Sequence, residues 1–108
     1  MLPAHYNAAI GGSTPGVLSE YRVFEAAALV ATPAHLSDEE AATLPCAALT
    51  AWNALYEGRQ LVPGETVLVL GAGGAVGIAA VQIAKALGAK VIAAASSEAK
   101  RALALKAG

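Results

Sequence analysis

A glycine-rich segment between two apolar stretches has the composition to bind a phosphorylated cofactor. It reads Leu70-Gly-Ala-Gly-Gly-Ala-Val-Gly77, and it follows the apolar run Thr66–Leu70 and precedes an alanine-rich helical pattern. A turn that binds pyrophosphate must reverse tightly, bring backbone N–H groups to the phosphate and start a helix close to the strand, so it requires glycine or alanine. The anion then rests on free N–H groups at the positive end of the helix. The segment predicts a dinucleotide-binding turn.

The spacing of these glycines departs from the usual fingerprint. Counted from Gly71, the pattern G-x-G-x-x-G fails because Val76 stands at the third glycine position. Counted from Ala72, it becomes A-x-G-x-x-G with Gly74 and Gly77 in place. A glycine-rich turn can also serve only to pack a helix on a sheet, and methyl-donor cofactors use similar turns. Because a strand precedes the turn, and a helix and a second strand follow it at the right distances, dinucleotide binding is favoured, with methyl-donor binding as an alternative.

The end of the second strand indicates which nicotinamide cofactor would bind. A carboxylate there binds the ribose hydroxyls of NAD, whereas this strand ends in alanines followed by Ser96, Ser97 and Lys100. A carboxylate about 4 Å from a 2′-phosphate would cost roughly 4 kcal/mol per unit charge at an effective dielectric of 20. Its absence, together with two hydroxyls and a lysine, predicts NADP rather than NAD. The simpler alternative is that Ser97 only caps a helix and Lys100 is a solvated charge.

Two short strands and two helices are expected to position these residues. The strands are residues 66–70 and 90–94, and the helices are residues 75–87, closed by Gly88, and a last one capped by Ser96 or Ser97. The order strand, helix, strand, helix predicts a βαβ unit with a parallel sheet.

The first half of the chain is expected to hold strands and then helices. Residues 17–24 alternate loosely and predict a half-exposed strand, and residues 28–32 predict a second, short one. Ser37 and Glu40 form a capping-box pattern that begins a helix. That helix is expected to break near Pro45, with a second helix from about Cys46 to Glu57.

Composition excludes several classes of function. The 108 residues are 56% hydrophobic and 14% charged, with a formal net charge of -1, which argues against disorder and against nucleic-acid or anionic-membrane partners. One cysteine permits no internal disulfide, and the first residues lack the pattern of a signal peptide, so we expect a cytoplasmic protein. The uncharged stretch 66–84 consists of a run typical of a strand followed by a pattern typical of a helix, which argues against a single membrane-spanning helix.

These segments resemble the medium-chain dehydrogenase/reductase superfamily, and within it the quinone-oxidoreductase-like and zinc-type alcohol-dehydrogenase-like members. The resemblance covers nearly the whole chain and rests on GVLSEYRVF, LSDEEAATLPCAALTAWNALYEG and LVPGETVLVLGAGGAVGIAAVQIAKALGAKVIAAASSEAK. It implies an α/β fold: residues 1–46 would be the tail of a β-rich GroES-like catalytic domain. Residues 47–108 would be the first βαβα of a Rossmann domain, a doubly wound parallel sheet, so we expect part of a larger enzyme.

The resemblance also implies an activity: NADPH-dependent transfer of hydride to a small-molecule quinone, enone or carbonyl, or oxidation of an alcohol in reverse. Whether the chain alone is an enzyme stays open, and no catalytic residue is predicted. The alternative is a non-catalytic, nucleotide-binding or oligomerising remnant, for instance a homodimer formed through an exposed edge strand.

Residues of this chain take cofactor roles from the same resemblance. Thr50 would lie against the nicotinamide ring, the turn would face the pyrophosphate, and the residues after the second strand would hold the 2′-phosphate. Ala75 stands where close relatives usually have glycine, which puts a methyl group near the phosphate. The predicted cofactor-binding residues are Thr50, Ala72, Gly73, Gly74, Ala75, Val76, Ser96, Ser97 and Lys100.

No metal site is expected in this chain. Cys46 matches a zinc ligand of the zinc-dependent relatives, but a catalytic zinc needs three protein ligands, and neither His5 nor His35 has a ligand spacing to Cys46. A buried cysteine acting as a small hydrophobe is the preferred interpretation. Trp52 and Tyr56, four residues apart on one helix, are expected to pack in a core or an interface.

Overall fold

The computed structural model describes residues 9–57 and 59–108. The chain divides into two compact units, Met1–Ala31 and Thr32–Gly108, and each is treated by itself. The predicted boundary between residues 46 and 47 concerns the larger enzyme, and it stays a prediction.

The first unit contains little regular structure in its described residues. An isolated parallel bridge joins Ile10 and Thr14, and a single 3-10 turn, η2, spans Ala26–Ala28. The strands predicted at residues 17–24 and 28–32 are wrong for this structure, since neither segment is assigned to a strand. Alternating side chains define the two faces of a strand, but a strand also needs a hydrogen-bonded neighbour and a covered face. Residues 17–24 are exposed throughout and have neither among the described residues.

The second unit begins with the predicted capping box. Helix α1 spans Asp38–Ala41 with Ser37 as its N-cap. The Glu40 N–H donates to Ser37 Oγ at 3.2 Å, and the Ser37 N–H donates to Glu40 Oε2 at 3.0 Å. The predicted reciprocal bonds are confirmed.

The helical segment around Pro45 differs in detail from the prediction. The break falls at a turn just before Pro45, and a π-helical turn, η3, spans Leu44–Ala48 and leads into α2, Leu49–Tyr56. Pro45 lies in the first turn of this second helical segment, where a backbone N–H has no helical partner to lose. The second helical segment therefore starts two residues earlier than expected, and Glu57 is its C-cap rather than its last residue.

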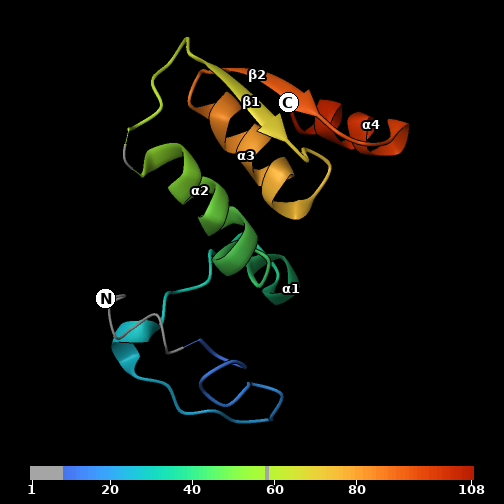
Figure 1. Ribbon diagram of the computed structural model, residues 1–108. Helices are drawn as coiled ribbons and strands as arrows, with labels where there is room; N and C mark the ends of the chain where they lie inside the picture. The colour runs from blue at the N-terminus through green and yellow to red at the C-terminus, as the bar shows by residue number, and fades with distance from the viewer. Residues whose placement is uncertain (1–8, 58) are drawn as a thin grey trace. The chain divides into compact units, whose positions relative to one another are not determined.

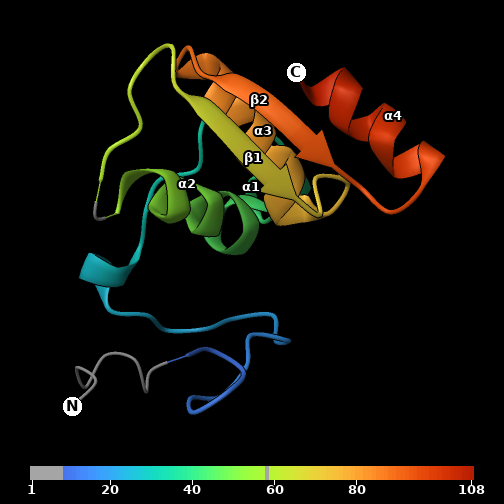
Figure 2. The ribbon, with the colours of Figure 1, turned by 45° about the horizontal axis from the view of Figure 1, so that its top comes forward.

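A two-stranded parallel sheet with two helices on one face forms the centre of this unit (Figure 1). Strand β1 is Thr66–Leu70 and β2 is Lys90–Ala94, paired from Thr66–Lys90 through to Leu70–Ala94. Helix α3 spans Ala75–Ala86 and α4 spans Glu98–Ala107 (Figure 2). Gly88, at φ +79°, closes α3 as predicted. The strand–helix–strand–helix order and the parallel pairing are confirmed.

The core lies between the sheet and these two helices. Its buried members are Val69 of β1, Ala72, Val81 of α3 and Ala104 of α4. The opposite face of the sheet is also apolar, as expected for a central strand, but there Leu68, Leu70 and Ile92 are 59%, 74% and 57% exposed. Within the described residues this second face is uncovered.

None of the helices in the described part of the chain is long and apolar enough to cross a membrane.

Candidate cofactor site

The glycine-rich turn leaves β1 through a residue in the left-handed region. Gly71 has φ +66°, a conformation that a residue with a side chain adopts only at a cost. Ala72 is fully buried and its N–H donates to the Ala94 carbonyl at 3.0 Å, which ties the turn to the end of β2. The Gly74 N–H donates to the Gly71 carbonyl at 2.9 Å. Gly74 is the extended N-cap of α3, at φ -93° and ψ 167°, so the turn is distinct from the helix that follows it.

The start of α3 presents uncommitted backbone donors. The first helical bond from this end runs from the Ile78 N–H to the Gly74 carbonyl, 2.8 Å. The N–H groups of Ala75 and Val76 precede it and have no hydrogen-bond partner among the described residues, and Gly74 supplies no capping side chain. Both residues are exposed. Such an end carries positive partial charge and open N–H donors, which is the arrangement that binds a phosphate group.

Gly77 allows α3 to start directly against the turn. A β-carbon at Gly77 would overlap the carbonyl oxygen of Gly71 and lie 2.7 Å from the Cα of Ala72. Because both neighbours are backbone atoms, no side-chain rotation would relieve the contact. The third glycine of the pattern, counted from Ala72, therefore has a steric role that the structure makes explicit.

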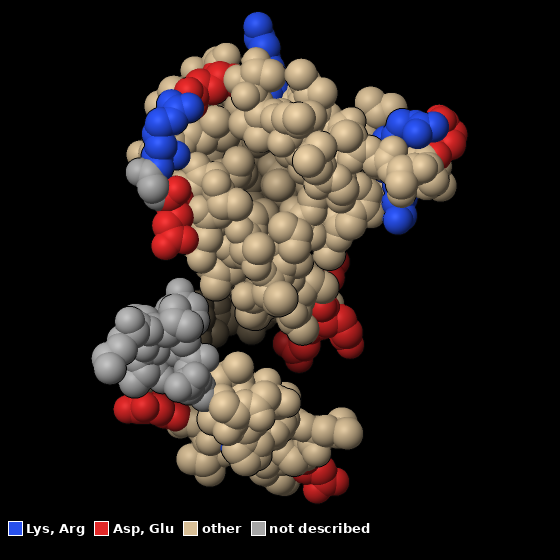
Figure 3. All heavy atoms as spheres, in the orientation of Figure 1, with Lys and Arg blue, Asp and Glu red and all other residues tan. Residues whose placement is uncertain are grey.

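A groove of about 570 Å³ runs along β1 beside the turn. Besides β1, the turn and α3, two residues of α2, Ala54 and Leu55, line it. Figure 3 shows the neighbouring surface as largely free of charged side chains, with Lys, Arg, Asp and Glu toward the rim of this unit. A groove of this kind can take an apolar body next to a phosphate-binding helix end.

The residues after β2 lie at the same end of the sheet as the turn. Ser97 is the N-cap of α4, and its Oγ accepts from the Lys100 N–H at 3.3 Å. Ser96, Ser97 and Lys100 are all exposed. The stem of Lys100 lies against Gly73, so the glycine-rich turn and the first turn of α4 are in contact. The structure thus brings together eight of the predicted residues: Ala72, Gly73, Gly74, Ala75, Val76, Ser96, Ser97 and Lys100.

Thr50 lies apart from this group in the chain, in the first turn of α2. Its hydroxyl donates to the Cys46 carbonyl at 2.6 Å, so the proton of that hydroxyl is already used within the helix. The oxygen can still accept a hydrogen bond. Thr50 is exposed and does not line the groove beside the turn.

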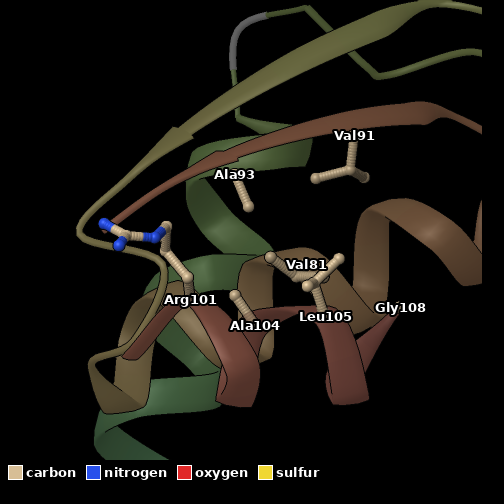
Figure 4. A pocket seen from close by; sticks show the side chains of 7 residues that line it. All are labelled: Val81, Val91, Ala93, Arg101, Ala104, Leu105 and Gly108. Carbon is tan, nitrogen blue, oxygen red and sulfur yellow. The ribbon is translucent and has the colours of Figure 1, made fainter. Parts of the chain in front are cut away.

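Arg101 is a charged residue of this region that the sequence interpretation did not single out. Its Nη1 donates to the Ala95 carbonyl at 3.5 Å, and its Nη2 pairs with the carboxylate of Glu98. It also borders a cavity of about 230 Å³, into which Val91 and Ala93 point from β2 toward Val81 of α3 (Figure 4). The sequence offered one signal for Arg101: it directly follows Lys100, in the first turn of the predicted helix.

The structure contains no ligand set for a metal among residues 9–57 and 59–108. Cys46 is exposed, so the expected buried cysteine is wrong, because nothing in the described part of the chain covers this side of η3. His35 is exposed and His5 lies outside the described residues. Trp52 stacks on Tyr56 with ring centroids 4.2 Å apart and planes 12° from parallel. Trp52 is 46% exposed, so it does not pack in a core of the described residues, and packing in an interface stays a prediction.

The chain is similar to known proteins in both sequence and structure. A zinc-type alcohol dehydrogenase-like protein of Schizosaccharomyces pombe is 49% identical over 104 residues, which cover 94% of this chain and 30% of that protein. The quinone oxidoreductase of Thermus thermophilus, whose structure was also solved with NADPH, superposes with a TM-score of 0.69 at 52% identity over 74% of this chain and 27% of that one. The chain belongs to the medium-chain dehydrogenase/reductase superfamily. The matched fold contains a Rossmann domain, which confirms the expected fold class.

A third relative is named for a different reaction. The acryloyl-coenzyme A reductase of Metallosphaera sedula is 44% identical over 85 residues, 79% of this chain and 25% of that protein. The chain therefore spans about a third or less of the length of these superfamily members. No family model matches the chain.

Proposed function

We propose that this chain binds the adenosine and pyrophosphate part of NADPH and serves an oxidoreductase that transfers hydride to a quinone, an enone or a carbonyl, or oxidises an alcohol in reverse. The observation that carries the proposal is that Ala75 and Val76, two exposed residues at the start of α3, have N–H groups without a hydrogen-bond partner in the part of the chain that the structure describes. They lie at the same end of the sheet as Ser97 and Lys100, which offer further donors.

The residues present fit this cofactor on chemical grounds. The N–H groups of Ala75 and Val76 would donate to the pyrophosphate, and the bare surface of Gly74 lets the phosphate approach the backbone. The 2′-phosphate would accept hydrogen bonds from Ser96, Ser97 and Lys100. The first carboxylate after β2 is that of Glu98, so none directly follows the strand to repel the phosphate. NADPH supplies the hydride when bound; the chain's own residues bind and orient it.

The longer relatives also support a proposal about the larger enzyme. We propose that residues 1–46 continue a GroES-like catalytic domain and that residues 47–108 begin the Rossmann domain. Thr50, at the start of α2, would contact the nicotinamide side of the cofactor. The relatives at 49%, 52% and 44% identity carry names for a dehydrogenase-like protein, a quinone oxidoreductase and an acryloyl-coenzyme A reductase, which supports acceptors with a polarised double bond. The cytoplasmic location, the lack of a nucleic-acid partner and a homodimer stay predictions from the sequence.

A ligand-dependent unfolding experiment tests the proposal. The melting temperature of the chain is measured with increasing NADPH, NADH or S-adenosylmethionine, since a ligand that binds only the folded state stabilises it by RT ln(1 + [L]/Kd). We expect NADPH to raise the melting temperature most and NADH less. No response to either nicotinamide cofactor, or a response to S-adenosylmethionine alone, would contradict the proposal. Turnover is then tested in a protein that contains this chain and its surrounding sequence, by following the oxidation of NADPH by a quinone or an enoyl thioester through the absorbance of the reduced nicotinamide.

A further inference from the structure

The π-helical turn η3 is held by a side-chain hydroxyl as well as by backbone bonds. The Leu49 N–H donates to the Leu44 carbonyl, the wide spacing of a π-helix, and also to the Cys46 carbonyl. The Thr50 hydroxyl donates to that same Cys46 carbonyl at 2.6 Å. A hydroxyl that bonds to a carbonyl inside a helix competes with the ordinary α-helical pattern. The Thr50 side chain therefore takes part in the bonding that departs from a regular helix.

This turn faces the start of α3 across a small cavity. The two elements contact one another, and the cavity between them has a volume of about 250 Å³. Leu44, Ala47 and Ala48 line it from η3, and Ala75 and Ile78 line it from the first turn of α3. The N–H of Ala75 has no hydrogen-bond partner among the described residues and is a proposed phosphate donor. The wall formed by η3 is thus a direct neighbour of that donor.

A change of η3 to α-helical spacing would move this wall. A π turn holds one more residue in each hydrogen-bonded ring than an α turn does. If α2 stays in place, the loss of that extra residue would rotate the segment before it by about 100° and shift it by about 1.5 Å along the axis. Leu44 would then no longer lie where it now faces Ala75 across the cavity.

We propose that Thr50 is a positioning residue for the pyrophosphate: its hydroxyl holds the Cys46 carbonyl, keeps η3 in the π-helical form, and so keeps the wall beside the start of α3 in place. The inference rests on the proposed function. It differs from a contact between Thr50 and the nicotinamide ring, because it requires an effect on a ligand that has no nicotinamide. Thr50 does not line the groove beside the glycine-rich turn, so its effect there would pass through η3.

The test compares the affinities of the chain for NADPH and for 2′-phospho-ADP-ribose, which keeps the pyrophosphate and lacks the nicotinamide. Thr50→Val has nearly the same shape and helix propensity as threonine but no hydroxyl. We expect it to lower both affinities about fivefold, the effect of one hydrogen bond. Thr50→Ser is the matched control, since it keeps the hydroxyl, and it should change either affinity by less than about twofold.

A second measurement needs no ligand. The backbone NMR chemical shifts of Leu44–Leu49 should change in Thr50→Val and stay close to the original in Thr50→Ser. A general loss of stability would not confine the change to this turn. Unchanged shifts in Thr50→Val would overturn the inference, because η3 would then keep its form without the hydroxyl.

The ligand measurements separate the inference from the proposed function. If the original chain binds neither ligand, the proposed function fails and the inference fails with it. If Thr50→Val weakens NADPH but not 2′-phospho-ADP-ribose, Thr50 acts at the nicotinamide, so the proposed function stands and the inference is wrong. The inference is also wrong if Thr50→Ser weakens both ligands as much as Thr50→Val. If Thr50→Val does not fold, Thr50→Ala replaces it, with the same outcomes.

Discussion

Gly77 lies against the backbone of Gly71, so closely that a methyl group on Gly77 would overlap the Gly71 carbonyl oxygen. The two glycines have different roles in one turn. Gly71 supplies the left-handed conformation at the end of β1, at φ +66°, and Gly77 supplies the close approach that lets α3 start beneath it. We expect the position of the unpartnered N–H groups of Ala75 and Val76 to depend on both glycines.

Gly77→Ala should destabilise the chain although alanine is the better helix former. Alanine at an open helical site would stabilise by about 1 kcal/mol, whereas overpacking against fixed backbone costs about 1–3 kcal/mol. We expect the steric term to dominate and the melting temperature to fall by several degrees. Gly74→Ala is the matched control, since its β-carbon would meet only the Gly71 oxygen at 3.4 Å. A Gly77→Ala chain as stable as the original would show that the turn tolerates a wider separation.

Ala75→Pro should remove one phosphate donor while leaving α3 intact. Proline lacks the N–H and is well tolerated at the first helical position, and the preceding Gly74 already has the extended conformation that a residue before proline prefers. We expect stabilisation by NADPH and by NADH to fall together, by about fivefold in affinity for a lost hydrogen bond of about 1 kcal/mol.

Asp38→Pro is the matched control for that experiment. It places proline at the first position of α1, after the extended Ser37, and away from the turn. Unchanged cofactor binding in Asp38→Pro together with unchanged binding in Ala75→Pro would exclude the Ala75 N–H as a ligand.

Ser97→Asp should separate helix capping from cofactor choice. Aspartate caps a helix about as well as serine and its charge suits the N-terminus of α4, so stability should be retained. A carboxylate next to the 2′-phosphate should lower NADPH affinity at least tenfold and spare NADH. Ser97→Ala should instead lose about 1 kcal/mol of stability, because Ser97 Oγ accepts from the Lys100 N–H. If Ser97→Asp binds NADPH as well as the original chain does, the 2′-phosphate lies elsewhere.

Glu65 should contribute stability that is lost in acid. The Val62 N–H, which donates to Glu65 Oε2 at 2.9 Å, and then Arg59, whose Nη2 lies 2.7 Å from Oε1, hold the pKa of Glu65 below its usual 4.5. A carboxyl group with a lower pKa in the folded than in the unfolded state stabilises the fold above the unfolded pKa, and the effect disappears as the pH falls through the folded pKa.

The measurement for Glu65 is the melting temperature as a function of pH. The original chain should be more stable than Glu65→Gln near neutral pH, and the difference should narrow as the pH falls below about 4.5. Arg59→Met should reproduce only the smaller part, because the Val62 bond is the larger cause. A difference that stays constant down to acid pH would rule out the charge of Glu65 as its source.

Predictions made from local patterns were the most accurate. The Ser37–Glu40 box is a set of bonds within four residues, and both bonds form. The strand at Thr66–Leu70 and the helix closed by Gly88 likewise follow from side-chain period and from one residue's conformational range. Residues 17–24 have a comparable local pattern, yet they form no strand, since pairing requires a partner segment that the pattern does not specify.

The sequence by itself determined where the glycine-rich turn lies and which side chains follow β2, because both depend on residue type over short spans. Only the tertiary structure decided that Gly73 has no room for a side chain, that Lys100 rests on the turn, and that Cys46 is exposed. Each of these is a distance between segments far apart in the chain or a question of what covers a surface. Such properties follow from how the helices pack on the sheet, and no local run of residues encodes them.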